Sequence, residues 1–397
     1  MVLVQHATRF QKLDELLASH RHWWQVQAFH HRDFPWLESS LVGELRALSD
    51  DQIEELAKDS EQLVRWLSQW IPQLSQVTSL QRLPKCPRRD LHIPPRLDIQ
   101  IPGRKWQQIQ AFLASRRASQ AHVLEWCAGK GHLGRCLGVL DQCSVSSLEW
   151  QAELCKQGEI LARRQPHTQN FVCADAFSSE ARQHIEVGME VVALHACGDL
   201  HTQLMRHCCE RSVTALTFSP CCYHLIQGDV YRPMSKQALA AQLSLTRQDL
   251  SLPLQQTVTA GASVRRRRDK ELQWRLAFDE WQRSFRRQDS YLPLPTLRAE
   301  HLKMSFSNFV AAMAEKKGLQ SLGAVDEDRW LEAGHERFRL VRRMELVMHA
   351  FRRPLELWLV LDRALYLQEQ GAQVSVGEFC EPSLTPRNIL LDARWVR

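Results

Sequence analysis

Apolar and polar residues change their periodicity twice along this chain. In the first 80 residues they follow helical spacing, most clearly in "LVGELRALSDDQIEELAKDSEQLVRWLSQWIPQL". There Ser49 is the predicted N-cap before an acidic first turn. The next 20 residues, 83–102, contain five prolines and little periodicity, which indicates an extended linker. The pattern predicts a helical N-terminal domain over residues 1–82 and a Pro-rich linker over residues 83–103.

From about Lys105 onward, short apolar runs alternate with intervals of helix length. Five such runs follow one another: "HVLEWC", "CSVSSLEW", "NFVCADAF", "VVALHACGD" and "VTALTFSPCC". Strands that alternate with helices indicate a parallel sheet covered on both faces. Near the end, the helical run "PLELWLVLDRALYLQEQG" precedes two more strand-like runs, "AQVSVGEFCE" and "RNILLDARW". We therefore expect a seven-stranded, Rossmann-like α/β domain made of residues 104–231 and 346–397, with an antiparallel pair at its end.

The glycine loop "EWCAGKGHLG" contains G-x-G-x-x-G and directly follows the first predicted strand. In open parallel sheets the first strand-to-helix turn meets the ligand. Glu125 could neutralise the ammonium group of S-adenosylmethionine, Glu149 could accept both ribose hydroxyls, and Asp175 could accept from the adenine amino group. These carboxylates favour S-adenosylmethionine over a dinucleotide, and over a tight turn that binds nothing. The predicted cofactor-binding residues are Glu125, Cys127, Gly129, Lys130, Gly131, Glu149, Asp175 and His195.

The loops after the fourth and fifth predicted strands, "HACGDL" and "SPCCYH", are expected to cap the space in which a methyl group is transferred. A hydroxyl or ring-nitrogen acceptor needs positioning and proton removal. Asp199 and His224 are the predicted bases, and Tyr223 is predicted to form a wall for a flat substrate. The predicted catalytic residues are Asp199, His224, His195 and Tyr223.

The cysteines of "SPCC" leave two alternatives open. A thiolate could act as a covalent nucleophile, as in cytosine-5 methyltransferases, but the rest of that signature is absent. Cys221, Cys222 and His224, with Cys197, could also offer four metal ligands. Adjacent cysteines rarely ligate the same zinc ion, because C-x₂₋₄-C spacing is the norm. We therefore expect no metal, and assign Cys221 and Cys222 to substrate binding.

Residues 232–345 are predicted to form a mostly helical, Arg-rich insert. Trp274, Phe278, Trp281 and Phe285 fall at helical spacing and are expected to be its buried face. The first 80 residues carry 7 basic and 11 acidic side chains, which leaves 44 basic and 34 acidic in the rest. A dense arginine face suits a phosphate backbone, so RNA is the expected partner, with a protein or a small molecule as alternatives. The predicted RNA-contacting residues are Arg265, Arg266, Arg267 and Arg268.

Targeting signals add little to this picture. The start of the chain has too short an apolar run for a signal peptide, and no segment approaches the roughly 20 apolar residues of a membrane span. The 12 cysteines lie mostly in apolar runs. We expect reduced thiols, a cytoplasmic location and no membrane partner.

Four motifs, "EWCAGKGHLG", "LHACGDL", "SPCCYH" and "LDRALYLQEQG…LTPRNILL", resemble a group of class I methyltransferases. The group joins the ribosomal RNA adenine dimethylase domain-containing proteins, the glutathione S-transferase C-terminal domain-containing proteins and the tRNA acceptor-stem 2′-O-methyltransferases. The resemblance covers residues 100–230 and 350–397. It implies the fold and S-adenosylmethionine, although Cys127 stands where the first motif glycine is usual. A protein methyltransferase and a non-catalytic RNA- or ribosome-binding scaffold remain as alternatives.

Overall fold

The computed structural model describes residues 2–165, 167–255, 262–319 and 324–395. The chain divides into two compact units. The sheet unit contains Met1–Ser19, Ser79–Thr259 and Arg352–Arg397, and the helical unit contains His20–Thr78 and Ala260–Phe351.

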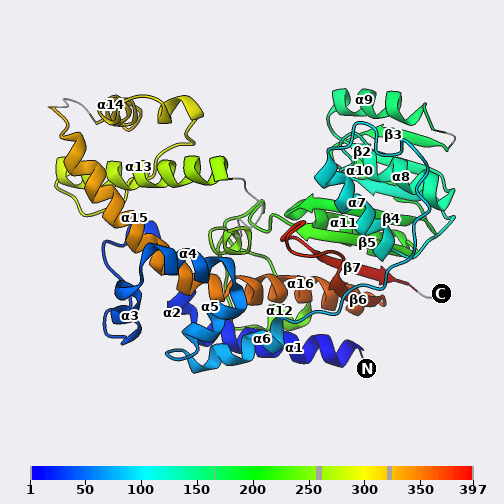
Figure 1. Ribbon diagram of the computed structural model, residues 1–397. Helices are drawn as coiled ribbons and strands as arrows, with labels where there is room; N and C mark the ends of the chain where they lie inside the picture. Colours follow the sequence, from blue (N-terminus) through cyan, green and yellow to red (C-terminus); the bar gives the residue numbers. More distant parts are fainter. Residues whose placement is uncertain (1, 166, 256–261, 320–323, 396–397) are drawn as a thin grey trace. The chain divides into compact units, whose positions relative to one another are not determined.

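The described strands of the sheet unit form one mixed sheet of seven strands in the order β3-β2-β1-β4-β5-β7-β6 (Figure 1). Strands β1 to β5 are parallel, whereas β7 is antiparallel to both β5 and β6. The prediction of a mostly parallel α/β sheet is confirmed, and the terminal strands form the expected antiparallel pair. The strands are β1 (Val123–Trp126), β2 (Val145–Glu149), β3 (Gln169–Cys173), β4 (Glu190–Cys197), β5 (Ala215–Cys221), β6 (Gln373–Glu378) and β7 (Ile389–Arg394).

Helices cover both faces of this sheet because alternate side chains of each strand point to opposite faces. On β1, Glu125 points toward helix α8 (His132–Asp141) and accepts a hydrogen bond from Gly134 there. Trp126 points the other way, and its ring meets that of His207 on α11 (Asp199–Arg211) with the centroids 6.4 Å apart. The remaining helices of this unit are α1 (Val2–Ser19), α7 (Gly103–Ser115), α9 (Ala152–Ala162), α10 (Ser179–Gln183), α12 (Lys236–Leu239) and α16 (Arg352–Glu369).

The helical unit is built around two long helices, α13 (Ala262–Arg286) and α15 (Glu327–Ala350), which pack against each other. Trp274, Phe278 and Trp281 of α13 are buried as predicted, but Phe285 is 40% exposed. Ser49 caps α4 with a capping box, as expected. The other α-helices are α2 (Arg21–Trp24), α3 (Leu41–Ala47), α4 (Asp50–Lys58), α5 (Ser60–Leu67) and α14 (Phe306–Lys316), with α6 (Val77–Gln81) at the boundary of the units.

The two units divide the chain differently from the domains expected from sequence. Helix α1 belongs to the sheet unit, because Phe10 stacks on Trp358 of α16 and Asp14 accepts a 3.0 Å hydrogen bond from the same indole. Residues 232–259 also belong there, since Asp362 of α16 accepts from the backbone of Met234 and Ser235. The remaining N-terminal helices and the Arg-rich insert form a single unit instead of two. Periodicity could not reveal this, because it does not show which amphipathic faces meet.

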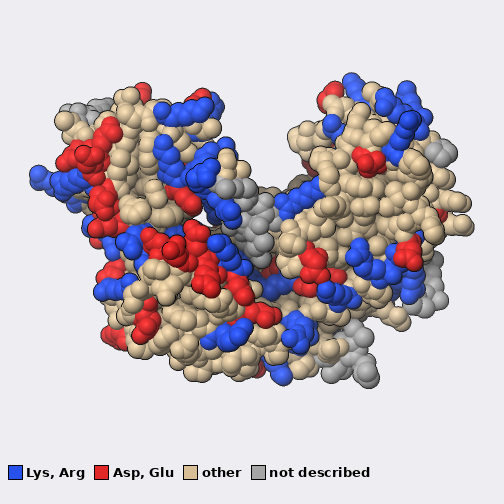
Figure 2. Space-filling view, viewed as in Figure 1, with Lys and Arg blue, Asp and Glu red and all other residues tan. Residues whose placement is uncertain are grey.

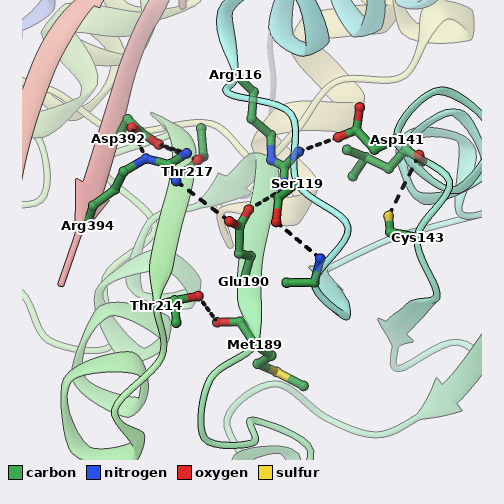
Figure 3. A network of polar contacts seen from close by, with 12 residues as sticks. Arg116, Ser119, Asp141, Cys143, Met189, Glu190, Thr214, Thr217, Asp392 and Arg394 are labelled. Carbon is green, nitrogen blue, oxygen red and sulfur yellow. Dashed lines mark hydrogen bonds and ion pairs between the residues drawn. The ribbon is translucent and has the colours of Figure 1, made fainter. Parts of the chain in front are cut away.

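A buried network of charges fixes the amino ends of the central strands (Figure 3). The side chain of Arg116, which follows α7, is fully buried and forms ion pairs with Asp141 at the end of α8 (2.6 Å) and with Glu190 at the start of β4. Arg394 at the end of β7 lies 3.6 Å from Glu190 and also pairs with Asp392. The network therefore joins two helices and two strands at the edge of the sheet opposite the glycine loop.

Replacing Arg116 tests this network. Arg116→Leu should destabilise the sheet unit by about 3–5 kcal/mol, because it removes a buried cation that pairs with two buried carboxylates. Arg163→Leu is the matched control, since Arg163 is exposed and lies 4.0 Å from Glu159; a change within about 0.5 kcal/mol is expected there. Native-state hydrogen exchange of the strand amides would report on this unit alone. Equal protection in the two variants would contradict the role of the network.

Candidate functional site

The glycine loop connects β1 to α8 with an unusual run of backbone conformations. Cys127, Gly129 and Gly131 all have positive φ, at 57°, 59° and 64°. A Cβ added to Gly129 would meet no atom within 4 Å, so this side of the loop is open to a ligand. Cys127 is the exception in such a run, because only glycine adopts this conformation without strain. Burial, aided by Glu149, raises the pKa of the Cys127 thiol to about 12, so this residue is a neutral thiol at neutral pH.

Beneath the loop, Glu125 is part of a buried polar network. Its carboxylate accepts hydrogen bonds from Gly134 N at 3.0 Å and from Ser147 Oγ at 2.8 Å. Gln169 donates to Ser147 and to the carbonyl oxygen of Gly131, at 2.9 and 2.8 Å. These contacts hold the loop from below. A contact of Glu125 with an ammonium group stays a prediction, as does the cofactor role of Lys130, whose side chain is exposed.

Glu149 and Asp175 lie at the carboxyl ends of adjacent strands. Glu149 is buried and accepts from Gly129 N at 2.9 Å and from Gln151 N at 3.0 Å. Asp175 is exposed and accepts from Phe177 N at 3.0 Å. Two large apolar side chains near these carboxylates are solvent-exposed, Trp150 by 68% and Phe177 by 42%. Sequence reasoning missed both rings, although each lies within two residues of a predicted carboxylate.

Backbone hydrogen bonds tie together the two loops predicted to contact the methyl acceptor. Gly198 N donates to the carbonyl oxygen of Cys221 at 3.0 Å, and Asp199 N donates to that of Leu225 at 2.9 Å. A side chain at position 198 would collide with the carbonyl of Leu225, so glycine is required there. The carboxylate of Asp199 is already engaged, because it accepts from Gln227 N at 2.8 Å.

Three cysteines converge in these loops. The sulfurs of Cys197, Cys221 and Cys222 all lie within 4.8 Å of one another, and those of Cys197 and Cys221 are 3.5 Å apart. Hydrogen bonds from Cys197 and Cys221 lower the pKa of Cys222, and the nearby His224 and Arg387 add to that shift. The hydrogen bond with Cys197 raises the pKa of Cys221. The three thiols therefore share one set of short contacts.

Tyr223 does not form the wall that was predicted from sequence. Its side chain is only 1% exposed, and its ring packs on the guanidinium of Arg363, 5.1 Å from the ring centroid. Burial holds the pKa of Tyr223 well above its usual range. The adjacent His224 is half-buried, and its Nδ1 has no hydrogen-bond partner among the described residues. His195 lies in β4, but its side chain is outside the described part of the chain.

Helix α16 supplies positioning residues that sequence reasoning did not assign. Arg363 donates to His201 Nε2 at 2.7 Å and to the hydroxyl of Tyr231 at 3.1 Å. Burial, followed by the charge of Arg363, lowers the pKa of His201 well below its usual range, so His201 stays neutral and bridges Arg363 to the carbonyl oxygen of Ala196. Asp362 accepts from Tyr231 and from the backbone after it. A charged Asp-Arg pair inside the apolar run "LWLVLDRALYL" was the available signal.

Asn388 also acquires a structural role. Its amide donates to the carbonyl oxygen of Cys380 at 2.9 Å and accepts from Arg353 at 3.1 Å. These two hydrogen bonds link the turn between β6 and β7 to α16.

The Arg-rich helix α13 offers fewer free arginines than its sequence indicates. Arg283 is buried and pairs with Asp279 at 2.8 Å, and Arg275 pairs with Glu271 at 3.0 Å. The four arginines of the first turns, Arg265 to Arg268, are all exposed. Figure 2 shows basic side chains gathered over this end of α13. These four arginines, and Arg287 just after the helix, match the expected solvent-facing arginine surface.

Because Glu125 is buried, we expect the stability of the fold to depend on pH. Burial raises the pKa of Glu125 to about 7, although hydrogen bonds from Ser147 and Gly134 oppose the shift. The unfolded carboxyl ionises near pKa 4.3, so the folded state binds more protons between these values. The stability contribution of Glu125 is therefore complete below about pH 4 and decreases as the pH rises to about 7, by about 4 kcal/mol in all.

Glu125→Gln should remove this part of the pH dependence. Hydrogen exchange of the β1 amides at about pH 5 and about pH 8, corrected for intrinsic exchange rates, would measure it. Glu153→Gln is the control, because Glu153 is an exposed residue of α9 that accepts a hydrogen bond from Gln157. If the wild type and Glu125→Gln lost stability equally with rising pH, the raised pKa would be disproved.

Comparison with known proteins places this site in a recognised domain. Residues 104–229 match a family model described as a methyltransferase domain. The glutathione S-transferase C-terminal domain-containing proteins of mouse and human are 30% and 29% identical to this chain over 131 residues, which is 32% of this chain and 20% of their own length. The chain is thus similar to about a fifth of the length of these relatives.

Solved structures are similar over a comparable stretch. The precorrin-6y C5,15-methyltransferase of Geobacter metallireducens is 11% identical with a TM-score of 0.25, covering 32% of this chain and 66% of that one. An rRNA methylase of Streptococcus thermophilus is 11% identical with a TM-score of 0.24, covering 30% and 74%. Among the described helices, none is long and apolar enough to cross a membrane. Residues 104–229 are thus similar to a methyltransferase domain.

Proposed function

We propose that this chain is an S-adenosylmethionine-dependent methyltransferase that acts on RNA. The observation that carries the cofactor assignment is the hydrogen bond between Gly129 and Glu149. The amide of Gly129 donates to the Glu149 carboxylate at 2.9 Å, while the other side of this glycine is open. A carboxylate has about four lone-pair sites, and Glu149 uses two of them within the chain. Two sites are left for the hydroxyls of a ribose.

The exposed rings of Trp150 and Phe177, which lie near Glu149 and Asp175, support an adenine-containing ligand. Trp150 directly follows Glu149, and Ala174 N donates to the carbonyl oxygen of Glu149 at 3.1 Å, which brings the segment of Asp175 and Phe177 to the same edge. Exposed aromatic rings beside a carboxylate can stack on a base while the carboxylate accepts from its amino group. We assign Trp150 and Phe177 to the base, and Asp175 to its amino group.

We assign the binding site of the methyl-accepting substrate to the loops after β4 and β5. S-adenosylmethionine supplies the methyl group when it is bound. The chain must orient a nucleophile and accept its proton. His224 has a buried ring nitrogen without a partner among the described residues, which suits a proton acceptor. Asp199, already bonded to Gln227 N, retains lone pairs for a second role.

Charge supports RNA as the substrate class. Arg265 to Arg268 are four successive exposed arginines, and phosphate contacts of this kind supply sequence-independent affinity. A protein substrate is the alternative, and it is favoured if these arginines make no contribution to RNA binding.

Cofactor choice is tested by calorimetry. The purified chain should bind S-adenosylhomocysteine and show no measurable affinity for NAD. Glu149→Ala and Asp175→Ala should each weaken binding by about 10-fold or more, because each removes hydrogen bonds to a ligand. Glu153→Ala, an exposed change on α9, should leave the affinity unchanged. Preference for NAD, or equal affinities in all variants, would end the cofactor assignment.

RNA binding is tested by its salt dependence. Replacing Arg265 to Arg268 by Gln should weaken binding to many RNA sequences about equally, and should flatten the log–log salt slope by roughly 2–3, at about 0.7 per phosphate on a single strand. The control replaces four other exposed basic residues of the helical unit by Gln, namely Lys58, Arg65, Arg298 and Lys316. Equal slopes for the two variants would reject Arg265 to Arg268 as the RNA surface and make a protein substrate the leading hypothesis.

A further inference from the structure

The convergence of three thiols is the feature that the proposed methyl transfer leaves unused. Cys197 ends β4, whereas Cys221 ends β5 and Cys222 follows it. Their sulfurs lie within 4.8 Å of one another. Cys221 is buried, while Cys197 and Cys222 are half-buried, so a small ion could reach the cluster from solvent.

Local backbone geometry explains how two adjacent cysteines face the same point. In an extended strand, neighbouring side chains point to opposite faces. Cys222 instead has a φ of 48°, a left-handed conformation that is uncommon for a residue with a side chain. This turn of the backbone brings the Cys222 sulfur back beside that of Cys221. The expectation of no metal, which rested on the adjacency of these cysteines, does not account for this conformation.

The third thiol is positioned by the neighbouring strand. The register between β4 and β5 shifts between Leu194 and Cys197, after which Cys197 pairs with Cys221. The amide of Gly198 then donates to the carbonyl oxygen of Cys221 at 3.0 Å. Strained backbone persists where the surrounding structure over-determines it, which is common at ligand sites. The three sulfurs are therefore held together by the fold before any ion arrives.

We propose that Cys197, Cys221 and Cys222 bind a zinc ion. Two thiolates bound tetrahedrally to one zinc at about 2.3 Å each lie about 3.8 Å apart, close to the 3.5 Å between Cys197 and Cys221. Thiolate ligands select zinc and copper(I) over magnesium or calcium, and a three-thiolate tetrahedral site suits zinc. A disulfide would use two of the three sulfurs and leave the third without a role.

The ion would have a defined place in the molecule. It would join the loop after β4 to the loop after β5, which also carry Asp199 and His224. With three protein ligands, zinc keeps a fourth position for water or another donor. This inference does not depend on the proposed function, because it concerns only the chain's own sulfurs.

Metal analysis of the full-length protein tests the proposal. Purified under reducing conditions without chelators, it should contain one zinc ion per chain. Cobalt(II) exchanged into the site should show thiolate-to-metal charge-transfer absorption. Cys197→Ser, Cys221→Ser and Cys222→Ser should each weaken zinc affinity at least about 100-fold in competition with a chromogenic chelator, since even supporting partners of ligands contribute 10–100-fold. Cys209→Ser is the control, because Cys209 belongs to another adjacent pair, on α11.

A measurement on the unmodified protein covers the case in which the serine variants do not fold. Removing zinc with a chelator should lower the melting temperature, and adding zinc back should restore it. Failure of the wild type to bind zinc on reconstitution would overturn the proposal. So would full zinc content in a Cys221→Ser, Cys222→Ser double variant, or a Cys197–Cys221 disulfide in the reduced preparation. A zinc protein that does not bind S-adenosylhomocysteine would reject the proposed function and leave the zinc site intact.

Discussion

The sheet depends on a charge that is buried where solvent cannot reach it. Arg116 has no exposed side-chain surface and forms ion pairs with Asp141 and Glu190, which come from different elements. Removing one partner of such a network leaves an uncompensated charge in the interior. The helix before Arg116, the helix that ends at Asp141 and the strand that begins at Glu190 must therefore keep their relative positions. Since β1 and β4 are neighbours, the same constraint positions their opposite ends, where the candidate site lies.

At the opposite edge of the sheet, hydrogen bonds hold the loops in position. The amide of Gly129 is fixed by Glu149, and the loop after β5 is fixed by Asp362 and Arg363 of α16. These hydrogen bonds lie within the protein, so the chain itself holds both loops in place. A preorganised site loses less conformational entropy on binding. The ring of Trp150 is exposed, and Nδ1 of His224 has no hydrogen-bond partner among the described residues.

The helical unit shows how charge in a sequence can mislead. Its longest basic helix carries arginines along most of its length, yet Arg283 and Arg275 neutralise carboxylates of the same helix. Arg337 of α15 likewise pairs with Glu280 and donates to the carbonyl oxygen of Phe29 at 3.0 Å. These cations stabilise the packing of segments that are far apart in sequence. Arg265 to Arg268, by contrast, are four successive exposed arginines, which is why they carry the RNA proposal.

The sequence by itself determined the order of the strands and the position of the glycine loop. The seven strands follow from local periodicity, and the glycines with Glu149 follow from the geometry of a strand-to-helix turn. Only the tertiary structure decided which elements belong together, because α1 packs on α16 through Phe10 and Trp358. It also decided that Tyr223 is interior and that three thiols meet. The reason is physical: local pattern reports which face of an element is apolar, whereas contacts between distant segments depend on the match of two surfaces that no single stretch of sequence contains.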